Sequence, residues 1–166
     1  MRVVKHIIWL VLLTVAQSVL GRFIKIYGCI PDLLAGYSII TAFCTKKEKE
    51  AAYVMLAAGI LSGSCVGRIF PATVFYIGIG SAAAWVMSEY FRFTPALVRI
   101  SAVVLLTASA VSVTECFVSY RVINKSIFLY NILPFVLYTT FAACVIYPLV
   151  VRTMYRKSDK KLMLIK

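Results

Sequence analysis

Six apolar runs occupy almost the entire chain of 166 residues, at 7–23, 29–45, 50–67, 72–88, 97–118 and 127–151. A helix needs roughly 20 mostly apolar residues to cross the ~30 Å hydrocarbon core of a bilayer. The segments between the runs are too short to fold as a separate domain. We therefore predict an all-α polytopic membrane bundle of six transmembrane helices over residues 1–151, followed by a basic cytoplasmic tail at 152–166.

The composition points the same way, since 62% of the residues are hydrophobic and only 14% are charged. The mean hydropathy is +0.92. A soluble globular domain is nearer half apolar and about a quarter charged. This chain has too little polar surface to cover a water-soluble core, which leaves no room for a soluble catalytic domain.

The net charge of +12 could indicate a nucleic-acid partner, but the positions of the basic residues favour another explanation. With the N-terminus in the cytoplasm, thirteen Lys and Arg residues fall on the inner side of the membrane. Five fall on the outer side, namely Arg22, Lys25, Arg68, Arg121 and Lys125. This excess fits the positive-inside rule. It predicts an inner-membrane protein with both termini in the cytoplasm, anionic lipids as partners of the basic tail and no nucleic acid.

The first run could instead be a cleaved signal peptide, because Ala16-Gln17-Ser18 has the small-x-small form of a cleavage site. The apolar stretch continues through Val19 and Leu20, however, and this favours a retained helix.

Residue types that carry chemistry are sparse. The five cysteines form no C-x-x-C pair and His6 is the only histidine, so metal-ligand spacing is absent. Nucleotide-binding and hydrolase motifs are absent as well. We predict a protein that is not an enzyme and has no metal, no catalytic residues and no cofactor.

Pro31 and Asp32 open the second run. Proline suits the first helical position and aspartate suits the positive end of the helix dipole, so both have a structural explanation as the start of a helix. The functional alternative is that Asp32 pairs with an outer-face cation, which could be Arg22, Lys25, Arg68 or Arg121. An ionisable residue this close to lipid is a site candidate.

Gly59, Gly63 and Gly67 form a narrow stripe on the third run, because their spacing is slightly more than one helical turn. Glycines let another helix backbone approach closely. The stripe could pack inside the bundle or mark a subunit interface, and internal packing is favoured because five other helices are available. The small residues of the fourth run make it the expected neighbour.

Three further expectations concern polar positions. The cluster at 46–50 is interpreted as a solvated turn. Glu115 is expected to pair with Arg121 at the interface. Pro134 is expected to kink the sixth run, with the freed carbonyl satisfied by a hydroxyl or a neighbouring helix.

The order of these motifs resembles the family of the rod shape-determining protein MreD. The matching features are Gln17-Ser18, Pro31-Asp32-Leu33-Leu34, the charged turn, Gly59-x-x-x-Gly63, Pro134, Thr139, Tyr147-Pro148 and a basic tail. They cover nearly the whole chain. One position departs from the family, which often places an aspartate where this chain has Gly67, followed by Arg68.

The resemblance implies a non-enzymatic membrane scaffold of the bacterial cell-elongation complex. It would bind MreC and, indirectly, MreB, RodA and a class B transpeptidase, and help position lateral peptidoglycan synthesis. The implied partner-binding or packing residues are Pro31, Asp32, Gly59, Gly63, Gly67, Arg68, Pro134 and Thr139.

The same family resembles, in architecture, the membrane substrate-binding subunits of energy-coupling-factor transporters. Small-molecule (vitamin) uptake is therefore the alternative function. Those subunits commonly carry an alanine-x-x-x-alanine docking surface in the first helix, but here Leu12 and Leu20 flank Ala16. This difference favours the scaffold.

Overall fold

The computed structural model of the protein describes residues 2–23, 29–45, 47–66, 70–90, 94–120, 126 and 128–155. Within these ranges the chain forms helices and no strand. The predicted all-α fold is therefore confirmed.

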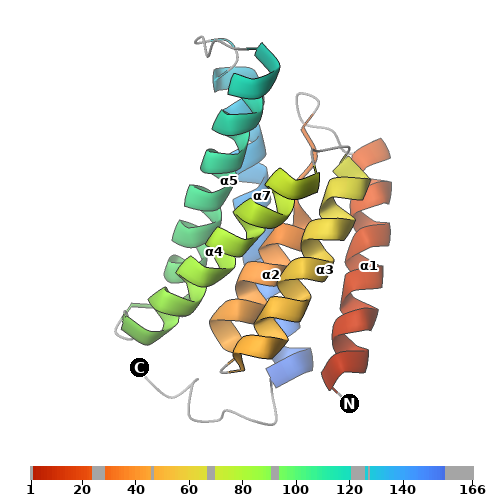
Figure 1. The fold of residues 1–166 in the computed structure, drawn as a ribbon, viewed down its shortest axis with the longest axis vertical. Helices are drawn as coiled ribbons and strands as arrows, with labels where there is room; N and C mark the ends of the chain where they lie inside the picture. Colours follow the sequence, from red (N-terminus) through yellow and green to blue (C-terminus); the bar gives the residue numbers. More distant parts are fainter. Residues whose placement is uncertain are drawn as a thin grey trace.

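Five long helices and one composite helix make up the bundle (Figure 1). The first five are α1 (Arg2–Phe23), α2 (Leu33–Cys44), α3 (Glu48–Val66), α4 (Phe70–Tyr90) and α5 (Ala96–Tyr120). The last helix joins a π-helical turn η1 (Phe128–Ile132), α7 (Leu133–Val150) and a second π-helical turn η2 (Val151–Tyr155). In Figure 1, α1 and α5 lie at opposite edges of the bundle.

The centre of the bundle is α2, which packs against α1, α3, α4, α5 and α7. Nine of its 12 residues are buried. A helix that is apolar on nearly every side has to be enclosed by other helices or by lipid. The hydrophobic core is therefore arranged around α2.

Three helices are long and apolar enough to cross a membrane among the described residues, with windows at Arg2–Val19, Ala96–Val113 and Phe128–Tyr155. Large apolar side chains also cover the outside, as at Ile8, Val11 and Val15 of α1. Soluble monomers rarely expose contiguous apolar patches of this kind. The helices and the surface together indicate a membrane protein.

The other three expected spans do not meet the same condition of length and hydropathy. Twelve residues are too few in α2. In α3, Glu48, Lys49 and Glu50 open the helix and Gly and Ser residues dilute its apolar character, as small residues also do in α4.

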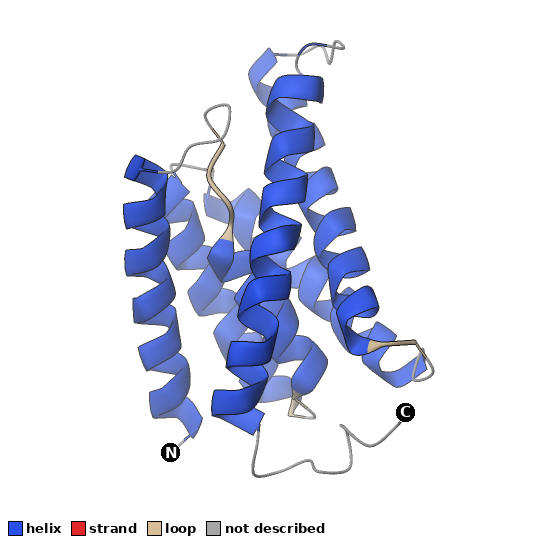
Figure 2. Cartoon of the chain, turned by 180° about the vertical axis from the view of Figure 1, so that it is seen from behind, coloured by secondary structure: helices blue, strands red, loops and turns tan. Residues whose placement is uncertain are grey.

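The second run differs most from its expected bounds of 29–45, because helix α2 begins only at Leu33. Residues 29–32 form a non-helical segment, which Figure 2 shows descending between the helices before α2 starts. The reason is Pro31, which disfavours helical geometry in the residue before it. The N-terminus of α2 consequently lies inside the bundle and away from its rim.

Pro134 does not kink the middle of a helix, as the sequence had led us to expect. It lies in the first turn of α7, and the irregular backbone is the π-helical turn η1 directly before it. The thiol of Cys29 donates a hydrogen bond to the carbonyl of Asn131 in η1, with a sulfur–oxygen distance of 3.4 Å. A neighbouring segment therefore satisfies a carbonyl there, although through a thiol and not a hydroxyl.

Gly59 lies where α3 and α4 pack closely together. A Cβ atom at this position would lie 2.8 Å from Cγ2 and 3.0 Å from the backbone Cα of Val74. Gly63 is buried too. Gly59 therefore packs inside the bundle, and Gly67 lies outside the described residues.

We predict that Gly59→Ala destabilises the bundle by about 1–3 kcal/mol, because a backbone atom of α4 has to move to admit the new methyl group. Gly78→Ala is the matched control on the facing helix. Its Cβ would lie 3.3 Å from the sulfur of Met55, which is the end of a flexible side chain. Thermal unfolding in detergent micelles would measure both. Equal melting temperatures for the two variants would contradict this account of the interface.

Candidate functional site

The start of α2 is capped by Asp32, whose side chain is 3% exposed. Its Oδ1 accepts a hydrogen bond from the amide of Ala35 at 3.0 Å. This geometry confirms that Asp32 serves to start a helix. Pro31 is fully buried and precedes the cap, so it does not occupy the expected first helical position.

Gln17 of α1 caps the next two amides. Its Oε1 accepts from the backbone N–H groups of Leu33 at 3.1 Å and Leu34 at 3.3 Å. The side chain is 1% exposed, so these bonds are shielded from water. Away from water, an unsatisfied backbone amide costs several kcal/mol. Gln17 thus removes an energetic obstacle to beginning a helix at this depth.

Two more helices reach the same point. The Ser62 hydroxyl of α3 donates to Asp32 Oδ2 at 2.7 Å, and the backbone amide of Asp32 donates to Thr139 Oγ1 of α7 at 3.2 Å. A helix N-terminus leaves four amides without intrahelical partners. Asp32 N, Leu33 N, Leu34 N and Ala35 N are all satisfied here. We call Gln17, Asp32, Ser62 and Thr139 the capping network.

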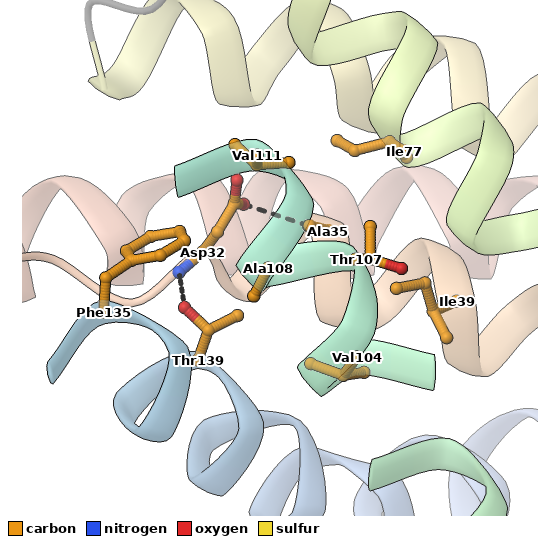
Figure 3. Close-up of a pocket in the computed structure, with 10 residues that line it drawn as sticks. All are labelled: Asp32, Ala35, Ile39, Ile77, Val104, Thr107, Ala108, Val111, Phe135 and Thr139. Atoms are coloured by element: carbon orange, nitrogen blue, oxygen red, sulfur yellow. Dashed lines mark hydrogen bonds between the residues drawn. The ribbon is translucent and has the colours of Figure 1, made fainter. Parts of the chain in front are cut away.

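A small cavity of about 20 Å³ adjoins the capping network between α2, α4, α5 and α7. Asp32, Thr139 and Phe135 lie together at one side of it, and Ile39, Val104 and Thr107 line the other side (Figure 3). This volume holds about one water molecule. Pockets for small organic ligands measure roughly 300–1,000 Å³. As it stands, the cavity is too small for a vitamin.

A second polar cluster joins Tyr37 of α2 to the starts of α1 and α3. His6 of α1, which is 5% exposed, bonds through Nδ1 to the hydroxyl of Tyr37 at 2.7 Å. Its Nε2 lies 2.8 Å from Glu50 Oε1 at the start of α3. We call His6, Tyr37 and Glu50 the polar clasp, because it joins α1, α2 and α3.

The polar clasp has the hydrogen-bonding order of a carboxylate–imidazole–hydroxyl relay, in which the imidazole activates the hydroxyl. Tyr37, however, is 0% exposed and stacks against Trp9, with ring centroids 6.1 Å apart. No substrate reaches the hydroxyl in this conformation. What the arrangement does is hold three helices together.

The sequence interpretation missed the clasp because it placed residues 46–50 in a solvated turn. Lys47, Glu48 and Lys49 are exposed as expected, but the turn is shorter than expected, because α3 already begins at Glu48. Glu50 does not fit the interpretation as a solvated residue, because its side chain is only 13% exposed. The spacing along α1 could have indicated the clasp. His6 and Gln17 lie on the same helical face as Leu10 and Leu13, which suggests that both polar side chains are buried.

The candidate residues separate into three groups. Pro31, Asp32 and Thr139 come together at the capping network. Gly59 and Gly63 are buried on α3, and Pro134 lies near the start of α7. Gly67 and Arg68 are outside the described residues. So are Lys25 and Arg121, and the side chains of Arg22 and Glu115 are also not described, which leaves the two expected ion pairs untested.

Sequence reasoning quoted Gln17 only as part of a motif and gave Ser62 no role of its own. Among the described residues, no group of three or more His, Cys, Asp or Glu side chains could hold a metal ion. No protein-family model, curated protein or solved structure matches the chain. The site is therefore defined by its own geometry.

We predict that Ser62→Ala lowers the stability of the bundle by about 1–3 kcal/mol, because the buried carboxyl group of Asp32 loses one hydrogen-bond donor. Ser64→Ala is the control two residues away. The Ser64 side chain is exposed and donates to the carbonyl of Ile60 in its own helix. Thermal unfolding should place Ser64→Ala within about 0.5 kcal/mol of the parent. If both variants unfold with the parent, the capping network does not stabilise the bundle.

Proposed function

We propose that the protein is a non-enzymatic membrane scaffold of the bacterial cell-elongation complex, related to MreD, whose helix bundle binds MreC. The observation that carries the proposal is the capping network. Gln17, the segment beginning Pro31-Asp32, and Thr139 are features of the resemblance, and they are far apart in sequence. They meet at one buried helix start. Motifs that share one structural task are better evidence of relationship than isolated matches.

The proposal includes six membrane crossings, and the lengths of the elements support it. At 1.5 Å per residue, α3 and α4 are about 28 Å and 31 Å long. The 12 residues of α2 supply about 18 Å, and the four non-helical residues before it add at most about 13 Å. The lengths of α3 and of α4, and the combined length of α2 and the segment before it, are each close to the ~30 Å of the hydrocarbon core. An extended segment is tolerated at that depth when protein encloses it.

The charges support a cytoplasmic location for the end where α1 begins and η2 finishes. These two elements meet there, since Lys5 Nζ donates to the carbonyl of Thr153 at 3.1 Å. Basic residues gather at this end: Arg2 and Lys5 lie in the first turns of α1, and Arg152 lies in η2. Arg2 pairs with Glu50 at the start of α3, next to Lys47 and Lys49, and Arg99 of α5 lies over Phe43 near the end of α2. The positive-inside rule favours the cytoplasm for such an end, and anionic lipid headgroups are its proposed partners.

A scaffold role fits the way the bundle uses its buried polar groups. Asp32, His6 and Glu50 all bond to other helices, and we assign them no catalytic step. What the bundle offers to the outside is chiefly apolar helix surface. Packing against such surface, helped by small residues, is how a single membrane helix is recognised within lipid.

The buried candidates would act on MreC indirectly. Pro31, Asp32, Gly59 and Gly63 set how closely the helices of the bundle approach one another, and so shape the surface that the MreC helix meets. Gly67 and Arg68 remain candidates for direct contact. MreB, RodA and a class B transpeptidase would be reached through MreC.

The transporter alternative is less favoured. The cavity beside Asp32 has a volume of about 20 Å³, far below that of a vitamin site. The docking surface expected around Ala16 has leucines on both sides.

We predict that MreC co-purifies with this protein in mild detergent. Ser62→Ala should reduce the recovered MreC several-fold, because the network that spaces the helices is broken, whereas Ser64→Ala should not. Quantitative immunoblotting at matched protein levels would measure the ratio. Recovery of the protein without MreC, under conditions that keep the other elongation proteins together, would contradict the pairing. Nanomolar retention of a small molecule by the purified protein would favour the transporter.

A further inference from the structure

We propose that the cavity beside Asp32 is a hydration site, in which one water molecule accepts the hydroxyl proton of Thr139 and donates to the carboxyl group of Asp32. The water gives α2 and α7 a second polar link beside the bond between the Asp32 amide and Thr139. The site belongs to the fold itself and does not depend on the proposed partner. Three observations support it: the size of the cavity, the bonding of Thr139 and the acceptor at Asp32.

The cavity has the size of a single water molecule. Its volume is about 20 Å³, and roughly 10–15 Å³ is enough to hold one water. The side chains around it include the buried Ile39, Ile77 and Val104. Size alone does not decide what fills it, because a cavity with a purely apolar lining stays dry. The polar groups at its wall therefore decide.

Thr139 brings a hydroxyl proton that still needs an acceptor. Its neighbour Thr140 donates to the carbonyl of Val136 in its own helix at 2.8 Å, which is a common arrangement for threonine in a helix. Thr139 is turned toward α2 instead, where its Oγ1 accepts from the amide of Asp32 at 3.2 Å. Within the described part of the chain it has no other hydrogen-bond partner, and it is buried. A buried donor without an acceptor is costly, and a water molecule supplies one.

Asp32 supplies the acceptor for that water. A carboxylate can accept about four hydrogen bonds, so it can bind a water in addition to the amide of Ala35 and the hydroxyl of Ser62. Figure 3 shows Asp32 and Thr139 together at one side of the cavity. A water molecule that bonds to both makes two hydrogen bonds, and buried waters typically make roughly two to four.

A water molecule suits this site better than a metal cation. Calcium and magnesium ions take roughly six or more oxygen ligands. Among the described residues that line the cavity, only Asp32, Thr107 and Thr139 carry a side-chain oxygen, and the Thr107 hydroxyl already donates to the carbonyl of Val103. The start of α2 is also the positive end of its helix dipole, which disfavours a cation.

The nuclear Overhauser effect between water and methyl protons tests the proposal directly, on the full chain in detergent micelles. We expect a cross-peak between water and the methyl group of Ala108, which is buried and lines the cavity. The methyl group of Ala84 is buried elsewhere in the core and should show none. A dry cavity would give no cross-peak at Ala108, and a cross-peak from the detergent chain in place of water would show an apolar occupant. Either result would overturn the proposal.

Variants of two adjacent threonines test which group holds the water. Thr139→Val removes the hydroxyl with little change in size, so the cross-peak at Ala108 should weaken several-fold. Thr140→Val, the matched control, removes a hydroxyl that bonds within its own helix and should leave the cross-peak unchanged. A cross-peak of parental strength in Thr139→Val would contradict the assignment.

A second variant serves if Thr139→Val does not fold. Ala108→Val fills the cavity with a larger side chain and displaces the water. Ala35 lines the same cavity, so the cross-peak between water and its methyl group should be present in the parent and disappear in this variant. Its persistence at parental strength would show that the water lies elsewhere and would overturn the proposal.

Discussion

The start of α2 is the constraint on which the rest of the bundle depends. A helix that begins within a lipid-covered bundle exposes four backbone amides where no bulk water can satisfy them. Asp32 accepts from one of them, and Gln17 of α1 and Thr139 of α7 supply acceptors for the other three. Ser62 of α3 then binds the carboxyl group of Asp32. The helix can therefore begin at this depth only when α1, α3 and α7 are packed against it.

The bundle is tied at two levels by polar bonds and filled between them by apolar packing. The capping network lies at the start of α2, and the polar clasp joins Tyr37 of α2 to the starts of α1 and α3. Helix α1 contributes to both through Gln17 and His6. Between them, close packing such as that of Gly59 against Val74 supplies dispersion contacts. In lipid, polar bonds act together with such packing in specifying which helices meet.

Periodicity and composition were enough to predict an all-α bundle, and Pro31-Asp32 correctly located a helix start. The depth of that start was not predictable, because it depends on Gln17 and Thr139, which are distant in sequence and bond to α2 only in the folded bundle. The burial of Glu50 was not predicted, for the same reason. A charged turn is ordinarily solvated, and only the long-range approach of His6 turns one of its acids inward.

The most direct test of the account is amide hydrogen exchange at Leu33, Leu34 and Ala35, measured by NMR on the protein in lipid nanodiscs. A helix start satisfied by the capping network should protect these three amides as strongly as those in the middle of α2. Gln17→Leu should selectively release the amides of Leu33 and Leu34 while Ala35 stays protected by Asp32. Rapid exchange of all three amides in the parent, as at a frayed helix end, would contradict the account.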